Sequence, residues 1–132
     1  MIVDTSALFA ILRQEADADR YTAALAGNGE ISMSAASYLE AAVVVDANGD
    51  PVLGGRFDDL LAAAGIEVVP FTPAQAELAR QAYRNFGRGS GHPARLNLGD
   101  CFSYALARAT GRPLLFKGDD FSQTDVTPAL EP

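Results

Sequence analysis

Short apolar runs alternate with longer helical patterns along the whole chain, and this alternation limits the fold more than any other feature. The apolar runs lie at residues 1–3, 31–33, 66–70 and 114–116, with a further edge run at 126–130. The patterns between them predict helices at 7–12, 16–26, 38–45, from the Pro51 break to residue 64, 73–86 and 98–110. Strands separated by helices form right-handed βαβ units. We therefore predict an α/β fold, with a central parallel sheet of four to five short strands and helices on both faces.

The size and charge of the chain narrow its function. Its 132 residues suit a single domain spanning residues 1–132, and a hydrophobic share of 48% suffices for a buried core. The net charge of −7 argues against a generally basic nucleic-acid binder, so such a partner needs a local patch or a metal ion. The sequence has no basic leader and no apolar run near the ~18–20 residues that cross a bilayer. We expect a cytoplasmic protein without a membrane contact.

The chain has one cysteine and one histidine, which removes several kinds of site. Cys101 alone makes no intramolecular disulfide and no multi-cysteine zinc site. It lies about 100° around the predicted helix from Asp100, so we interpret it as a core residue. His92 lies in a glycine-rich loop, and no Ser-His-Asp arrangement is evident around it.

Acidic residues follow the strands at the edge where parallel α/β sheets place their sites. Asp4 follows the first apolar run, Asp119 and Asp120 follow the last one, Asp100 lies at a helix start, and Glu40 lies in an apolar helix. Each has a structural explanation, as a helix cap, a solvated side chain or a turn residue. Clustered carboxylates repel unless protons or cations neutralise them. Carboxylate ligands favour Mg²⁺ or Mn²⁺, and phosphodiester transfer is the chemistry these ions serve.

Four stretches of the chain carry a resemblance to a known family. They are MIVDTSAL at 1–8, SYLE at 37–40, LGDCFSYALA at 98–107 and LLFKGDDF at 114–121. In these motifs, their spacing and the total length, the chain resembles a PIN-domain ribonuclease, and most closely a VapC-type toxin of a bacterial toxin–antitoxin pair. The resemblance implies a single PIN-like domain, RNA hydrolysis by Mg²⁺- or Mn²⁺-activated water, a cognate VapB-type antitoxin and a homodimer.

The resemblance also implies the acids of the site. Asp4, Glu40 and Asp100 match firmly as catalytic and metal-binding residues. The fourth acid is Asp119, which we place first because it directly follows Gly118, or Asp120.

Two hydroxyl residues follow the first acid. Thr5 and Ser6 match positions near the metal. One of them is also the expected N-cap of the first helix, and the two roles are compatible.

Basic residues gather in one part of this acidic chain. Between residues 80 and 95 there are four arginines and no acid. Arg88 and Arg95 are our candidates for holding RNA phosphates, and a solubilising helix face is the alternative. Lys117 precedes the acidic turn, where it has three open roles: pairing with a site acid, reaching a phosphate or forming a structural salt bridge.

Other functions remain as alternatives. A receiver domain needs paired acids after the first strand and a haloacid-type phosphatase needs Asp-x-Asp, whereas this chain has Asp4-Thr5-Ser6. Closer rivals are a non-catalytic PIN-like module that binds RNA or protein, and a housekeeping RNA-processing nuclease. The apolar segment 8–12 has more apolar surface than one helix face needs. The surplus surface could contact a second protomer, contact an antitoxin or fill the core.

Overall fold

The computed structural model describes residues 1–27 and 29–131. Four strands are present: β1 (Ile2–Val3), β2 (Ile31–Ser34), β3 (Ile66–Val69) and β4 (Leu114–Leu115). Six α-helices accompany them: α1 (Thr5–Leu12), α2 (Ala18–Ala26), α3 (Ala35–Ala47), α4 (Pro51–Ala64), α5 (Pro73–Phe86) and α6 (Leu98–Thr110). A short 3₁₀-helix, η1 (Phe121–Gln123), follows β4. The predicted boundaries of α4, α5 and α6 agree with these bounds.

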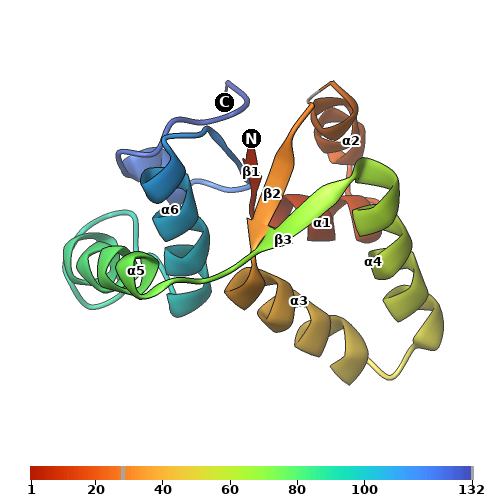
Figure 1. Ribbon diagram of the computed structural model, residues 1–132, viewed down its shortest axis with the longest axis horizontal. Coiled ribbons are helices and arrows are strands. Elements are labelled where there is room, and N and C mark those ends of the chain that lie inside the picture. Colours follow the sequence, from red (N-terminus) through yellow and green to blue (C-terminus); the bar gives the residue numbers. More distant parts are fainter. Residues whose placement is uncertain (28, 132) are drawn as a thin grey trace.

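The strands form one parallel sheet in the order β3-β2-β1-β4. Helices α5 and α6 lie on one side of this sheet and α1 to α4 on the other (Figure 1). The predicted α/β class is thereby confirmed, with four strands. The predicted edge strand at 126–130 is wrong, because the segment makes only an isolated bridge between Pro128 and Leu114. The bridge consists of two backbone hydrogen bonds: the Leu114 N–H donates to the Thr127 carbonyl, and the Ala129 N–H donates to the Leu114 carbonyl.

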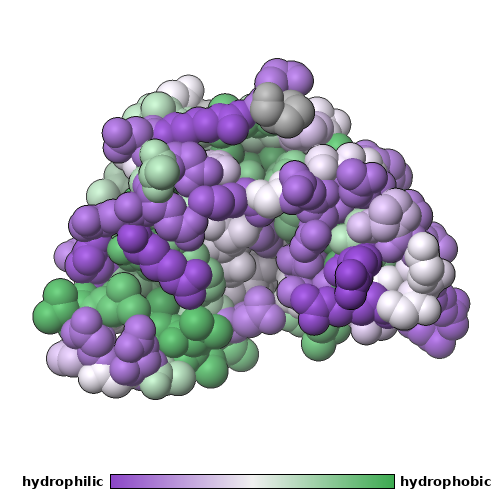
Figure 2. Space-filling model, turned by 180° about the vertical axis from the view of Figure 1, so that it is seen from behind, coloured by the Kyte–Doolittle hydropathy of each residue, from purple (hydrophilic) through white to green (hydrophobic). Residues whose placement is uncertain are grey.

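The outer surface carries exposed apolar side chains on two neighbouring helices. Leu39, Val43 and Val44 of α3 and Val52 of α4 are between 47% and 65% exposed. Figure 2 shows a hydrophobic area at its lower left, over these helices. Surplus apolar surface therefore lies on α3 and α4. Among the described residues, no helix combines the length and the apolar character that crossing a membrane requires.

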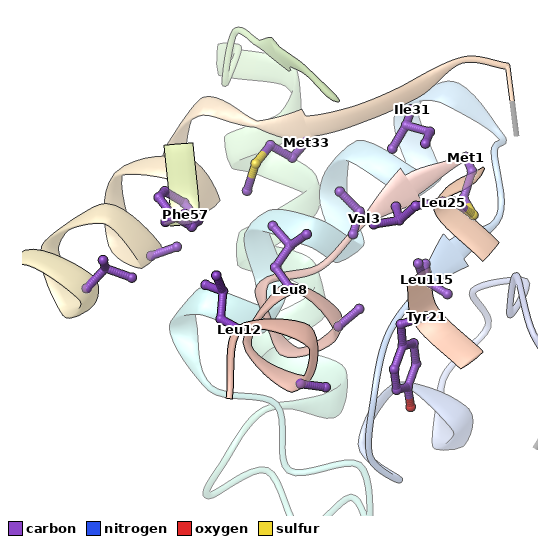
Figure 3. Packing of buried hydrophobic residues seen from close by; sticks show 14 residues of the cluster. Met1, Val3, Leu8, Leu12, Tyr21, Leu25, Ile31, Met33, Phe57 and Leu115 are labelled. Atoms are coloured by element: carbon purple, nitrogen blue, oxygen red, sulfur yellow. The ribbon is translucent and has the colours of Figure 1, made fainter. Parts of the chain in front are cut away.

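The apolar segment of α1, in contrast, is used in the core. Leu8 and Leu12 are at most 5% exposed and belong to one cluster with Val3, Met33 and Phe57 (Figure 3). The sheet separates this cluster from a second one under α5 and α6. Successive strand residues point to opposite faces. In β1, accordingly, Val3 faces the first cluster and Ile2 the second.

Candidate active site

The predicted acids come from four elements that meet at the carboxyl edge of the sheet. Asp4 follows β1, Glu40 lies on α3, Asp100 lies in the first turn of α6, and Asp119 and Asp120 follow β4. Because β1 and β4 are parallel neighbours, their carboxyl ends emerge side by side. The charges of Asp4, Glu40 and Asp120 all act on the Asp100 carboxyl. The structure thus brings four of the five predicted acids into one electrostatic group.

Asp4 is the buried member of the group, with 3% of its surface exposed. Its Oδ2 accepts hydrogen bonds from the Ser6 backbone N–H at 3.0 Å and from the Ser6 hydroxyl at 2.6 Å. Its Oδ1 accepts one from the Ser103 hydroxyl of α6 at 2.5 Å. The expected N-cap of α1 at Thr5 or Ser6 is wrong, since Asp4 itself is the N-cap. The Asp4 backbone is extended, and its N–H donates a hydrogen bond to the Leu115 carbonyl of β4.

Asp100 combines helix capping with a strongly shifted acidity. It forms a capping box with Asn97: the Asn97 N–H donates to Oδ2 at 3.0 Å, and the Asp100 N–H donates to the Asn97 side chain at 2.8 Å. Burial raises the pKa of the carboxyl to about 6, the Asn97 bond opposes this, and the charges of Asp4, Asp120 and Glu40 add to the rise. The capping role that we considered as the structural explanation is therefore real, and it coexists with membership of the acidic group.

Glu40 reaches the group from α3 by lying against a glycine. Its side chain is exposed as a whole, yet a Cβ built on Gly99 would overlap with Glu40 Oε1. Partial burial of the carboxylate, followed by the charge of Asp4, raises the pKa of Glu40. Only glycine leaves room at position 99 for this approach between α3 and α6.

Of the two acids after β4, Asp120 is the one whose charge acts on the Asp100 carboxyl. Gly118 has a φ of +105°, a conformation that suits glycine and turns the chain here. Asp120 raises the pKa of Asp100, whereas Asp119 lines a separate cavity of about 300 Å³ with Asp17 and Tyr21. The sequence favours Asp119 because it directly follows Gly118. The electrostatics support Asp120 instead.

Lys117 has a structural partner rather than a site partner. Its Nζ lies 2.5 Å from Glu15 Oε2 and 2.8 Å from Asp17 Oδ1, and the bonds to Asp17 and Glu15 raise its pKa. Of the roles left open for this side chain, the salt bridge is the one the structure contains. Its role in substrate binding stays a prediction, and in this structure its ammonium pairs with two carboxylates. Its backbone N–H donates to the Ser6 hydroxyl at 3.0 Å.

Arg88 and Arg95 are exposed and make no salt bridge within the described residues. A backbone bridge between Gly87 and Leu96 closes the loop that carries them. Arg95 has a φ of +50°, which is uncommon for a residue with a Cβ. Both guanidinium groups are therefore free to meet an anion.

The predictions for Cys101 and Thr5 have different outcomes. Cys101 is a free, fully buried residue, as its interpretation as core requires, and burial raises the pKa of its thiol to about 11. Thr5 is half-buried, and within residues 1–27 and 29–131 its hydroxyl makes no hydrogen bond. Thr5 thus lacks the contact to a site carboxylate that Ser6 makes.

Sequence reasoning missed three residues that shape the site. Gly99 makes room for Glu40, and the hydroxyls of Ser37 and Ser103 lie 3.3 Å apart beneath the acids. Spacing carries a signal for the serines, because Ser37 precedes Glu40 by three residues and Ser103 follows Asp100 by three. Residues three apart share a helix face.

The donor set of the group fits a hard cation. Carboxylate oxygens with elevated pKa values are ligands for Mg²⁺ or Mn²⁺, and the acids have no basic side chain paired with them in the described part of the chain. No three His, Cys, Asp or Glu side chains among the described residues already stand as close as a metal site requires. The exposed Glu40 and Asp120 are the members with freedom to move toward a cation.

Comparison with known proteins agrees with this geometry. The PIN domain model matches residues 1–126. Ribonuclease VapC28 of Mycobacterium tuberculosis is 56% identical over 131 residues, covering 99% of this chain and 98% of the relative. Ribonuclease VapC42 of the same species is 50% identical over 129 residues, covering 98% of each chain. This chain belongs to the PIN-domain family, among the VapC ribonucleases, and the resemblance is confirmed.

Solved structures support the fold. The structure of Mycobacterium tuberculosis VapC20, described as a sarcin-ricin loop cleaving toxin, matches with a TM-score of 0.74 at 19% identity. A toxin–antitoxin complex from Klebsiella pneumoniae matches with a TM-score of 0.70 at 17% identity. Each comparison covers 99% of this chain and 98% of the other.

Replacing Gly99 by alanine should move Glu40 without unfolding α6. The added methyl group occupies the place of the Glu40 carboxylate, which is the mobile end of a side chain and can swing away. We expect Mn²⁺ affinity, measured by titration, to fall by about 10–100-fold. Gly55→Ala in α4 is the matched control, since its Cβ meets nothing within 4 Å and should leave affinity unchanged. Equal Mn²⁺ affinity in G99A and the parent protein would contradict the role of Gly99.

Neutralising Asp100 should stabilise the metal-free protein above pH 6. The folded carboxyl, with a pKa of about 6 against an ordinary 3.8, binds its proton more tightly than the unfolded one. Folding stability therefore falls as pH rises from about 4 to 6, and stays reduced above that. Asp100→Asn keeps an acceptor for the Asn97 N–H and removes the charge.

Thermal unfolding in EDTA between pH 4 and 8 measures this effect. We expect a flatter pH profile and a higher Tm at pH 7.5 for D100N. The exposed Asp58→Asn controls for removing one charge from a chain of net charge −7. A profile for D100N that matches that of D58N would contradict the electrostatic origin of the shift.

Proposed function

We propose that this chain is a metal-dependent endoribonuclease and the toxin of a toxin–antitoxin pair. The observation that carries the proposal is the group formed by Asp4, Glu40, Asp100 and Asp120 at the carboxyl edge of the sheet. Relatives 50–56% identical over nearly the whole chain are named ribonucleases, which supports RNA as the substrate. The Klebsiella pneumoniae toxin–antitoxin complex has the same fold, which is compatible with an antitoxin partner.

Mg²⁺ or Mn²⁺ is the cofactor that these residues suit. Asp4, Asp100 and Glu40 would hold the ion, with Asp120 as the fourth acid. A divalent ion, when bound, lowers the pKa of a water molecule and stabilises negative charge on phosphate oxygens. In the part of the chain that the structure describes, the group consists of carboxylates, without a histidine or cysteine ligand that would favour a softer metal.

The chain itself contributes orientation and charge. Ser6 and Ser103 hold both oxygens of Asp4, and Asn97 holds one oxygen of Asp100. These donors are neutral, so they fix the carboxylates without removing their negative charge. Asp100 and Glu40, with their raised pKa values, are also the acids that gain most from a cation.

The net charge of −7 repels RNA, so binding of RNA phosphates requires a local group of basic side chains. Arg88 and Arg95 are exposed and unpaired within the described residues, and Arg95 lies five residues before Asp100. Arg80 and Arg84 extend the same basic strip along α5. We infer that this strip holds the phosphate backbone beside the acids.

A homodimer and a VapB-type antitoxin both need apolar surface on the toxin. The exposed side chains of α3 and α4 provide such surface, and Glu40 lies on α3 as well. Leu8 and Leu12 of α1 are buried, so these two side chains do not contribute to that surface. A protein partner on α3 would therefore lie close to the acids.

The first test is cleavage of total cellular RNA by the purified protein with Mg²⁺ or Mn²⁺ and then with EDTA. We expect metal-dependent fragments, and a rate reduced by roughly 100-fold or more in Asp4→Asn and Asp100→Asn, because both lose a ligand charge. Asp58→Asn should cleave normally.

The outcomes separate the rival functions. Full activity in both folded variants would refute the assignment of the acids. RNA binding without cleavage by the parent protein would favour the non-catalytic module. Fragments without toxicity in the host would favour a housekeeping nuclease.

Arg95→Ala should weaken RNA binding and leave the fold intact, since Arg95 is exposed. Losing one phosphate contact should reduce the slope of log affinity against log salt by about 0.7 for single-stranded RNA. Binding is measured in the Asp4→Asn background across a salt titration. Arg108→Ala, at the far end of α6, is the matched control. An unchanged salt slope for R95A would remove Arg95 from the RNA-binding surface.

A further inference from the structure

A chain of buried hydroxyl groups runs beneath the acids. Ser103 Oγ donates to Asp4 Oδ1 at 2.5 Å, and Ser37 Oγ lies 3.3 Å from Ser103 Oγ. Ser37 and Ser103 are each 1% exposed and Asp4 is 3% exposed, so no solvent competes for these contacts. The three side chains join the end of β1 to α3 and α6.

The direction of the two hydrogen bonds follows from the chemistry of the groups. An ionised carboxylate only accepts hydrogen bonds, and a serine hydroxyl has a single proton to donate. The Ser103 hydroxyl therefore donates its one hydrogen bond to Asp4. Toward Ser37, the Ser103 hydroxyl can act only as an acceptor. Ser37 therefore donates to Ser103, and Ser103 donates to Asp4.

Ser37, Ser103 and Asp4 thus form a hydrogen-bond relay. Its two serines lie on the helices that carry Glu40 and Asp100. Ser37 lies three residues before Glu40 on α3, and Ser103 lies three residues after Asp100 on α6. On each helix the serine is thus about one turn from its acid, on the same face. A shift of either helix against β1 would break the relay and displace the acid on that helix.

We propose that Ser103, oriented by Ser37, is a positioning residue that fixes the Asp4 carboxylate for metal binding. This inference rests on the proposed function. With Ser6 holding Oδ2 and Ser103 holding Oδ1, the carboxylate plane has one orientation before any cation arrives. The donors are uncharged, so the orientation is obtained without the neutralisation that a lysine or arginine partner would bring. Groups behind a metal ligand commonly change metal affinity by about 10–100-fold.

The test is Mn²⁺ titration of Ser103→Ala, Ser37→Ala and the double variant. We expect S103A to lower Mn²⁺ affinity by about 10-fold or more, and S37A to lower it by less, because Ser103 still reaches Asp4. The double variant should bind Mn²⁺ no more weakly than S103A, since Ser37 acts only through Ser103. On RNA, S103A should lower kcat and leave KM close to the parent value.

Ser32→Ala is the matched control for the loss of a buried hydroxyl. Ser32 is 4% exposed and accepts a hydrogen bond from Arg112 at 3.0 Å, and it lies outside the acidic group. S32A should lower the Tm without altering Mn²⁺ affinity. A purely structural role for Ser103 would make S103A behave like S32A, and this result would overturn the proposal.

Two further outcomes complete the test. If S103A does not fold, S37A alone decides, and unchanged Mn²⁺ affinity in folded S37A would overturn the proposal. Additive losses in the double variant would also overturn it, because they would show that Ser37 acts independently of Ser103. Failure of the proposed function is distinct from these results: the parent protein itself would then neither bind Mn²⁺ nor cleave RNA.

Discussion

A carboxyl group buried at the end of a strand is the constraint on which the rest of this molecule depends. Asp4 is as inaccessible as the leucines of the core, and a charge is tolerated there only where donors replace the lost water. The donors are the backbone and hydroxyl of Ser6 in α1 and the hydroxyl of Ser103 in α6. Satisfying one side chain therefore fixes how two helices sit against β1.

The same edge of the sheet is left electrostatically unfavourable. Burial, together with the charges of Asp4, Asp120 and Glu40, raises the pKa of Asp100 to about 6. Lys117 follows β4 closely in sequence, yet Glu15 and Asp17 hold its ammonium. The ammonium of Lys117 is thus paired with acids outside the group. Such sites trade stability of the empty protein for readiness to bind a cation.

Much of the fold could be predicted because local signals mark most boundaries. Pro51, Thr72 with Pro73, and Asn97 begin helices whose predicted bounds agree with the structure. The start of α1 has three successive residues that suit an N-cap, and the choice of Asp4 depends on its backbone bond to Leu115, which is distant in sequence. Local pattern cannot contain that contact.

The site divides in the same way. Asp4 could be predicted from its place at a strand end, and Glu40 and Asp100 from the family motifs; in the structure the charges of the three acids act on one another. The choice between Asp119 and Asp120 depends on the turn at Gly118, and the partners of Lys117 lie about a hundred residues away in sequence. The relay of Ser37 and Ser103 depends on how α3 packs on α6, which periodicity does not specify.

The closeness of Glu40 to Gly99 has an evolutionary consequence. A substitution of Gly99 can disturb the site without disturbing the fold, because an added Cβ displaces only the end of the flexible Glu40 side chain. A cell that must survive its own nuclease therefore has a one-codon route to a silenced protein that is still made, still folded and still able to occupy its partners. In collections of such genes, loss of this glycine would mark decay of toxicity before any decay of the fold.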